Sequence, residues 1–293
     1  MLVFITGASA GFGAAMTRRF VRDGHRVIAA ARRLERLQAL ATELGDAVLP
    51  FALDITDAAA VAALPGSLPE GWREVDVLIN NAGLALGLDP AQRSKLSDWE
   101  ATLATNVAGL MRMTHALLPG MVARNRGHIV NIGSTAGRYP YPGGHVYGAS
   151  KAFVAQFTLN LKADLIGTGV RVTVLEPGLV GGTEFSNVRF GDDAKAAAMY
   201  AGTEPLTPED IAEAAAWVVG LPPRMNVNRM EIMPLVQAPG PLAVTPGLRI
   251  SPVHQTTPTD PGRSERTRDV LMAERRRKTI ATPRAGQAAR RRV

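Results

Sequence analysis

Apolar and polar residues follow two alternating patterns from the start of the chain to about residue 236. Short runs of β-branched and other apolar residues indicate buried strands, and the longer stretches between them repeat apolar residues at helical spacing. We expect strands at Leu2–Thr6, Arg26–Ala30, Val48–Ala52, Val77–Asn80, Gly127–Ile132, Arg171–Glu176 and Met230–Met233. We expect helices at Phe12–Asp23, Leu34–Leu44, Asp57–Ser67, Asp98–Arg124, Val146–Ile166 and Pro208–Gly220.

A strand followed by a helix, repeated along the chain, predicts parallel strands whose crossover helices cover both faces of a sheet. Such crossovers are right-handed, which gives a doubly wound sheet of the Rossmann type. We therefore expect an α/β fold with about seven strands in a single domain over residues 1–240.

The composition changes after about Pro239, where Gly, Pro, Thr and Arg replace most apolar residues. Too few apolar residues follow to form a second core, so we expect residues 241–293 to be a disordered basic tail. Within this tail, Arg263–Ile280 has the pattern of a short basic helix that would form on contact with a partner.

The net charge of +7 is concentrated in the tail. Met1–Leu248 carries 21 Lys and Arg against 22 Asp and Glu, whereas Arg249–Val293 carries 12 against 4. The tail clusters Arg275–Lys278 and Arg290–Arg292 have the charge to attract phosphates, but the tail has no aromatic residue on which bases could stack. Any contact with nucleic acid is therefore expected from the tail alone.

The sequence contains no cysteine, which excludes disulfides, thiolate metal sites and a cysteine nucleophile, and fits a reducing compartment. It begins with a strand-like run rather than a basic segment followed by a long apolar stretch. No uncharged apolar run reaches the roughly 20 residues of a membrane span. We expect a soluble cytoplasmic protein with no membrane partner and no metal.

A glycine-rich loop connects the first expected strand to the first expected helix. Glycines let the backbone turn tightly and approach a pyrophosphate, and the helix start offers free N–H groups to that anion. The pattern GxxxxGK[ST] is absent, which disfavours a P-loop NTPase. The cofactor contacts expected in this loop are Gly7, Ala8, Ser9, Ala10, Gly11, Phe12 and Gly13.

The ends of the second and third strands predict which dinucleotide is bound. An acidic residue after the second strand would bind a free ribose 2′-hydroxyl, but Arg32 and Arg33 stand there and can hold a 2′-phosphate. We expect NADP(H), with Arg32 contributing more than Arg33; the alternative is a solvated basic start to the next helix. Asp54 would accept a hydrogen bond from adenine beside the Ile55 backbone, or would cap the following helix.

Tyr147 and Lys151 are four residues apart in an expected helix, so their polar ends lie on one face. A nearby ammonium favours the phenolate, and a tyrosine so tuned exchanges a proton with an alcohol or carbonyl oxygen. Ser134 follows a strand at the sheet edge where ligands bind, and its hydroxyl can stabilise charge on the substrate oxygen. The alternatives are a surface Tyr/Lys contact and an ordinary turn serine.

Together these residues resemble the short-chain dehydrogenase/reductase family over residues 1 to about 236. The matching elements are Thr6-Gly7-x-x-x-Gly11-x-Gly13, Asn80-Asn81-Ala82-Gly83, Asn106, Ser134, Tyr147-x-x-x-Lys151 and Pro177-Gly178. The resemblance implies that Tyr147 is the proton donor and acceptor and that Ser134 orients the carbonyl. It also implies that Lys151 binds the nicotinamide ribose and lowers the tyrosine pKa, and that Asn106 holds a water of the proton relay. A mid-helix Asn bonded to nearby backbone is the alternative.

The resemblance further implies that the segments after the fourth and sixth strands contact the nicotinamide half of the cofactor. These cofactor residues are Asn81, Ala82, Gly83, Pro177, Gly178, Val180 and Thr183, together with Tyr147 and Lys151. Thr183 departs from the family pattern, because it lies one residue farther from the proline than usual. Family members are commonly homotetramers.

Three segments resemble more closely the bacterial NADP-dependent 3-hydroxy acid dehydrogenases of this family: Gly83–Gly87, Leu117–Met121 and Glu176–Ser186. That subgroup oxidises serine, allo-threonine and 3-hydroxypropionate and reduces malonic semialdehyde. Such substrates need a partner for their carboxylate, and Arg189, in the loop that closes over substrate, is the first candidate. Arg138 near Ser134 is the second; for each, the alternative is a solvent-facing arginine.

The expected activity is thus hydride transfer between NADP(H) and the 3-hydroxyl carbon of a small hydroxy acid. A reductase of bulkier ketones or lipids is the alternative within the enzyme class. A dinucleotide-sensing binding protein with a nucleic-acid-binding tail is the alternative from another class.

Overall fold

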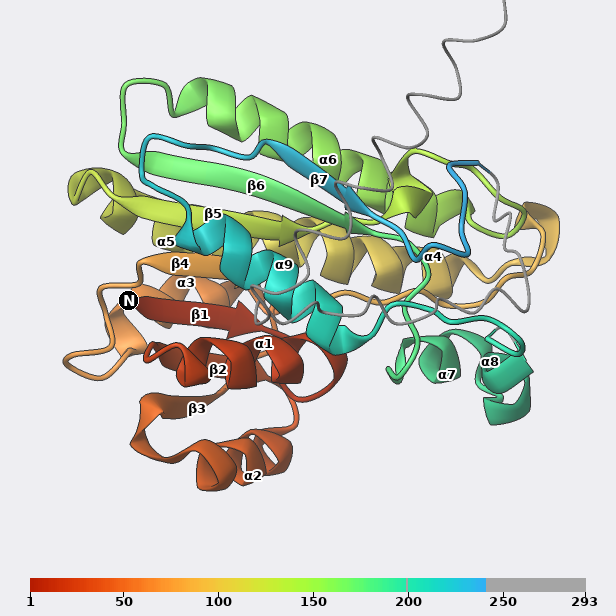
Figure 1. The fold of residues 1–293 in the computed structure, drawn as a ribbon, viewed down its shortest axis with the longest axis horizontal. Coiled ribbons are helices and arrows are strands. Elements are labelled where there is room, and N and C mark those ends of the chain that lie inside the picture. The colour runs from red at the N-terminus through yellow and green to blue at the C-terminus, as the bar shows by residue number, and fades with distance from the viewer. Residues whose placement is uncertain (199, 241–293) are drawn as a thin grey trace, which may run out of the picture. The chain divides into compact units, whose positions relative to one another are not determined.

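The structure, a computed structural model, describes residues 1–198 and 200–240. In this part of the chain seven parallel strands form one sheet with the order β3-β2-β1-β4-β5-β6-β7 (Figure 1). The strands are β1 (Leu2–Thr6), β2 (Arg26–Ala31), β3 (Val48–Ala52), β4 (Val77–Asn80), β5 (Gly127–Ile132), β6 (Val170–Pro177) and β7 (Arg229–Ile232). The predicted doubly wound sheet is confirmed. The expected tail, with its helix and arginine clusters, lies outside the described residues.

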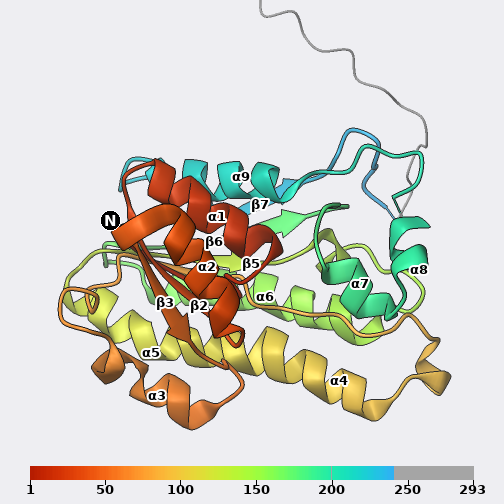
Figure 2. The same cartoon turned by 90° about the horizontal axis from the view of Figure 1, so that it is seen from below.

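Helices cover both faces of the sheet because successive strand side chains point to opposite sides. Val3 and Ile5 of β1 pack in a core with α1 and α9, whereas Leu2 and Phe4 pack in a second core with α3 and α5. Figure 2 shows α1 and α9 on one side of the strands and α3 and α5 on the other. The longer helices are α1 (Gly11–Arg22), α2 (Leu34–Leu44), α3 (Ala58–Ser67), α4 (Leu96–Leu103), α5 (Leu110–Ala123), α6 (His145–Asp164) and α9 (Pro208–Gly220).

The single helix expected over Asp98–Arg124 is interrupted in the structure. Between α4 and α5 the backbone forms the π-helical segment η3 (Ala104–Gly109). Gly109 packs against Ile55 so closely that a Cβ would lie 2.6 Å from the Ile55 Cδ1 atom. π-Helical turns occur frequently at functional sites. Here the turn carries Asn106, whose side chain is buried.

The segment expected to be a loop over the substrate forms two short helices, α7 (Phe185–Phe190) and α8 (Asp193–Ala198). Six residues each is too short for helical periodicity to be detected in the sequence. In Figure 2 both helices lie beyond the carboxyl end of the sheet. Among the described residues, no helix combines the length and apolarity that crossing a membrane requires.

Candidate active site

A cavity of about 480 Å³ opens at the carboxyl ends of the central strands, where ligands bind in doubly wound sheets. It collects most of the residues that were predicted from the sequence. Those that line it are Gly7, Ser9, Ala10, Gly11, Phe12, Arg32, Arg33, Asp54, Ile55, Asn81, Ala82, Gly83, Ser134, Tyr147, Lys151, Pro177, Gly178, Val180, Thr183 and Arg189. The predicted residues Ala8, Gly13, Asn106 and Arg138 do not line it.

The glycine loop is held in shape by the end of β4. Gly7 has a φ of +67°, and a Cβ there would lie 2.9 Å from the Ala82 Cα atom. The amide of Asn81 donates 2.8 Å to the Thr6 carbonyl, while the Thr6 hydroxyl accepts from the backbone N–H groups of Asn81 and Ala82. A Cβ at Gly13 would lie 2.4 Å from the Gly7 carbonyl oxygen. Gly13 therefore shapes the loop from behind.

Ala8 also supports the loop rather than facing the cavity. Its side chain is fully buried, and its backbone N–H donates 3.1 Å to the Ala30 carbonyl at the end of β2. This bond fixes the distance between the glycine loop and the two arginines that follow β2.

The two arginines after β2 have different surroundings. Arg33 donates from Nε and Nη2 to the Ser9 hydroxyl, at 3.3 and 3.1 Å, and from Nη1 to a carboxylate oxygen of Glu184 at 2.9 Å. Arg32 is exposed, and its charge lowers the pKa of Asp54. The sequence predicts a larger contribution from Arg32 than from Arg33, but in the structure Arg33 makes the more extensive contacts.

Asp54 does not cap the following helix. Its Oδ1 accepts from the Thr56 backbone N–H at 2.9 Å and from the Thr56 hydroxyl at 2.7 Å. The cap of α3 is Asp57, which accepts from two backbone N–H groups of the first turn. Burial alone would raise the pKa of Asp54, but the Thr56 bonds and Arg32 lower it below its ordinary value. Asp54 is therefore a carboxylate in the cavity wall.

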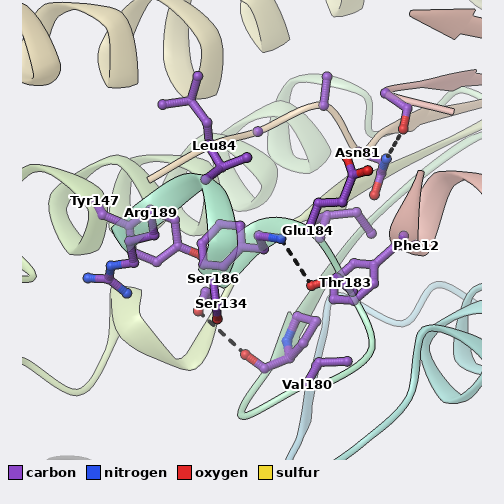
Figure 3. Close-up of a pocket in the computed structure, with 18 of the residues that line it drawn as sticks. Phe12, Asn81, Leu84, Ser134, Tyr147, Val180, Thr183, Glu184, Ser186 and Arg189 are labelled. Carbon is purple, nitrogen blue, oxygen red and sulfur yellow. Dashed lines mark hydrogen bonds between the residues drawn. The ribbon is translucent and has the colours of Figure 1, made fainter. Parts of the chain in front are cut away.

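Three of the residues predicted for proton transfer, Ser134, Tyr147 and Lys151, line the cavity close to one another. Figure 3 shows Ser134 and Tyr147, with Arg189 next to the tyrosine. The Lys151 ammonium lies 5.8 Å from the centre of the Tyr147 ring and donates 2.8 Å to the Ile132 carbonyl. The Ser134 hydroxyl accepts from the Ala136 backbone N–H at 3.1 Å, donates to the Pro177 carbonyl at 3.4 Å, and lowers the pKa of Tyr147. Ser134 thus links the end of β5 to the phenol.

The pKa of the Tyr147 phenol differs from the sequence expectation. Burial raises it to about 12, and the hydrogen bond with Ser134 lowers it only in part. Burial also lowers the pKa of the Lys151 ammonium to about 8. Burial dominates the pKa of both groups, and the Lys151 amine donates to the Ile132 carbonyl rather than to the phenol.

Asn106 sits behind the cavity wall. Its Oδ1 accepts from the Leu84 backbone N–H, and its Nδ2 donates to the Leu84 carbonyl, both at 2.8 Å. Nδ2 also lies 3.0 Å from the Ser150 hydroxyl. A Cβ at Gly83 would lie 3.3 Å from Asn106 Oδ1 and 3.4 Å from Lys151 Nζ. The π-helical turn therefore brings Asn106 next to the lysine across a glycine.

Of the two candidate carboxylate partners, Arg189 faces the proton-transfer residues and Arg138 does not. Arg189 is 8% exposed, donates 2.8 Å from Nη2 to the Tyr141 hydroxyl, and its guanidinium lies 5.5 Å from the Tyr147 ring centre. The solvent-facing alternative for Arg189 is wrong. Arg138 lies 3.7 Å from a carboxylate oxygen of Glu231, outside the cavity lining.

Several cavity residues were missed in the sequence. They are Leu84, Thr105, Tyr139, Tyr141, Glu184, Phe185, Ser186, Val188, Tyr200 and Gln237. Phe185 packs on Tyr147 with ring centres 5.5 Å apart, and the hydroxyls of Ser186 and Tyr200 are 2.6 Å apart. Glu184–Ser186 lay inside the segment of closest resemblance, but no spacing rule marked the three residues as cavity-lining.

Comparison with known proteins decides the family. The model of the short chain dehydrogenase family matches residues 1–193. The chain belongs to the short chain dehydrogenases. It is 61% identical over 239 residues to the NADP-dependent 3-hydroxy acid dehydrogenase of Salmonella typhi, covering 81% of this chain and 96% of that protein.

Two further relatives of this short chain dehydrogenase are named for serine. The serine 3-dehydrogenase of Agrobacterium fabrum is 48% identical over 237 residues, covering 80% of this chain and 94% of that protein. A solved structure of the closed form of serine dehydrogenase, complexed with NADP⁺, matches with a TM-score of 0.80 and 56% identity. That match covers 86% of this chain and 99% of the other.

Proposed function

We propose that this short chain dehydrogenase is an NADP(H)-dependent oxidoreductase of small 3-hydroxy acids: serine, allo-threonine and the 3-hydroxypropionate/malonic semialdehyde pair. One observation carries the substrate class, namely a buried arginine, Arg189, beside Tyr147 in the cofactor cavity. The names of the relatives support the same substrate class and cofactor.

The cavity residues fit NADP(H). The loop from Gly7 to Gly13 leads into the start of α1, whose backbone N–H groups would face the pyrophosphate, and the loop keeps this shape because a Cβ at Gly7 or Gly13 would strike backbone. Arg32 and Arg33 would hold the 2′-phosphate, and Asp54 with Ile55 would border the adenine. The nicotinamide half would lie against Asn81, Ala82, Gly83, Pro177, Gly178, Val180 and Thr183. When bound, the cofactor accepts or supplies the hydride.

Tyr147 would exchange the proton with the substrate oxygen. With a pKa of about 12, the phenol is protonated at neutral pH and ready to donate to a carbonyl during reduction. In oxidation it must accept a proton, so it needs positive charge nearby to stabilise the phenolate. Arg189 supplies such charge as long as no carboxylate neutralises it, and its effect on the Tyr147 pKa is downward. Ser134 would hold the same substrate oxygen by hydrogen bonding.

Lys151 and Asn106 would carry the proton onward and support the site. An amine with a pKa of about 8 can release a proton near neutral pH, which suits a relay between the phenol and solvent. Asn106 fixes the Leu84 backbone and contacts Ser150, the residue before Lys151. We place Asn106 as the residue that positions the relay.

Arg189 also favours a small substrate over a bulky ketone. Its guanidinium lies 5.5 Å from the Tyr147 ring and 5.3 Å from the Tyr141 ring, so only a short carbon chain separates a group bound to the arginine from one bound to the phenol. A 3-hydroxy acid has this arrangement. A large apolar ketone would leave the buried arginine without a counter-charge from the substrate, whereas the carboxylate of a hydroxy acid would supply one.

An absorbance assay at the reduced nicotinamide band tests the proposal. NADP and NAD are each supplied with L-serine and 3-hydroxypropionate, and the reduced cofactors with a hydrophobic ketone. We expect turnover with NADP and the small hydroxy acids. Turnover with the ketone alone would contradict the proposed substrate class. Equal turnover with NAD and NADP would contradict the assignment of NADP(H) as the cofactor.

We also propose a homotetramer working in the cytoplasm. Large apolar side chains are exposed along α4, α5 and α6, where a second copy of the chain would cover them. They are Leu96, Leu103, Met111, Phe153 and Leu159. Light scattering of the full chain should give four copies and, with Phe153→Glu, a smaller assembly; a monomeric wild-type chain would contradict this.

A further inference from the structure

A carboxylate already bridges the arginines at the expected 2′-phosphate site. Glu184 accepts from Arg33 Nη1 at 2.9 Å through one oxygen and from Arg36 Nη1 at 2.6 Å through the other. Arg33 also donates to the Ser9 hydroxyl in the glycine loop. The Arg33 guanidinium, at the start of α2, therefore contacts both the glycine loop and the residue that precedes α7.

Glu184 is anionic and its contacts are replaceable. The hydrogen bonds from Arg36 and Arg33 hold its pKa below the ordinary range. The side chains of Arg33, Arg36 and Glu184 are 41%, 45% and 45% exposed, so solvent screens the pairs and each contributes little to stability. A phosphate group carries more charge than a carboxylate and offers three acceptor oxygens to the same donors.

We propose that Glu184 is a cofactor-specificity residue that competes with the 2′-phosphate for Arg33 and Arg36. This inference rests on the proposed use of NADP(H). In the free protein the carboxylate neutralises the arginines, so binding a 2′-phosphorylated dinucleotide requires the ion pairs to open. NADH has no 2′-phosphate and leaves them closed. Glu184 therefore weakens the binding of NADPH and not of NADH.

The competition also connects the two halves of the cavity. Glu184 directly precedes α7, which carries Phe185 and Arg189 beside Tyr147. When a phosphate displaces Glu184, the start of α7 is released from α2. Coupling between two sites is reciprocal. If a bound substrate holds α7 against α2, it would therefore weaken NADPH binding by the same factor by which NADPH weakens the binding of that substrate.

Direct titration of the full chain with NADPH and NADH tests the inference, using the fluorescence of the reduced nicotinamide. In Glu184→Gln the side chain keeps its size but loses its charge. We expect the Kd for NADPH to fall about 3- to 30-fold, the range for removing two exposed ion pairs of about 0.3–1 kcal/mol each. The Kd for NADH should change less than twofold.

Glu213→Gln is the matched control. Glu213 also bridges two arginines, with Arg19 Nε and Arg22 Nη2 both at 2.7 Å, and it does not line the cavity. Its substitution removes the same charge and should leave both Kd values unchanged. Equal tightening in the control would show a general charge effect and overturn the inference.

Two other results separate the inference from the proposed function. In the first, Glu184→Gln has an unchanged or higher Kd for NADPH while the wild-type chain still prefers NADPH. This result overturns the proposed competition by Glu184 but not the assignment of NADP(H) as cofactor. A wild-type chain that binds NADH as tightly as NADPH overturns the assignment and the competition together.

Discussion

The guanidinium of Arg189 lies 5.5 Å from the ring centre of Tyr147, and the two side chains come from helices α7 and α6. The expected carboxylate partner and the expected proton-transfer group therefore share one end of the cavity. Burial raises the Tyr147 pKa and Arg189 opposes that effect. Neutralising Arg189 with a substrate carboxylate would make the phenol a weaker acid, so recognition and proton transfer are linked at this contact.

Arg189→Gln should separate acidic from neutral substrates. A charge-assisted hydrogen bond contributes about 1.5–3 kcal/mol, so kcat/KM for 3-hydroxypropionate should fall roughly 10- to 100-fold. For an uncharged primary alcohol the loss should stay below about threefold, the part due to the Tyr147 pKa. Arg138→Gln is the control and should affect neither substrate. Equal losses for both substrates would remove Arg189 from carboxylate recognition.

Arg32→Asp should raise the KM for NADPH far more than that for NADH. The substitution replaces a cation at the expected 2′-phosphate site with an anion, and we expect an increase of at least about tenfold for NADPH. Arg93→Asp, a change at an exposed arginine outside the cavity, provides the comparison. Steady-state kinetics with both cofactors measures it. An equal increase in the KM for both cofactors would show that Arg32 does not recognise the 2′-phosphate.

The oxidation rate should rise with pH through the range where Lys151 loses its proton. The Lys151 pKa is lowered to about 8 by burial, and a relay amine must be deprotonated to accept the proton that oxidation releases. We expect kcat for a hydroxy acid to increase from pH 7 to pH 9. In Lys151→Arg, which keeps the charge, this inflection should disappear. A rate that falls over the same range in the wild-type enzyme would argue against the relay.

Stability should fall as the solution becomes acidic because of His128. This imidazole is buried in the core, and burial lowers its pKa to about 3, whereas the unfolded chain has the ordinary value near 6.5. Below pH 6.5 His128 therefore binds a proton in the unfolded state, whereas in the folded state it stays neutral. From pH 7 to pH 5 this costs about 2 kcal/mol of unfolding free energy.

Urea unfolding at pH 7 and pH 5 measures that effect. His128→Asn keeps a polar group near the Thr173 hydroxyl, which lies 2.8 Å from His128 Nε2, and carries no titrating charge. The variant should lose less stability between the two pH values than the wild-type chain. The control variant His115→Asn, at an exposed position, should lose as much stability between the two pH values as the wild-type chain. Parallel behaviour of His128→Asn and wild type would assign the acid sensitivity to other groups.

The sequence predicts the sheet well and the substrate side poorly, for physical reasons. Strands buried on both faces are continuous apolar runs, so β1 to β6 lie within about a residue of their expected ranges. The π-helical turn at Asn106 is missed because its apolar spacing differs little from that of an α-helix. Helices α7 and α8 are too short to show periodicity.

The other features that the sequence does not predict depend on contacts between residues far apart in the chain. The Arg33–Glu184 pair joins positions 151 apart, and the Arg189–Tyr141 pair joins positions 48 apart. Neither pairing follows from local spacing. The raised pKa of Tyr147 is likewise invisible in the sequence, because burial by the surrounding elements determines it.

The most direct test of the account is Tyr147→Phe, measured for both turnover and cofactor binding. Removing one hydroxyl takes away general acid–base catalysis, so kcat for 3-hydroxypropionate should fall by about 10² to 10⁴, while the Kd for NADPH stays within about twofold of wild type. Turnover within a few-fold of wild type, with NADPH bound normally, would contradict the assignment of proton transfer to Tyr147.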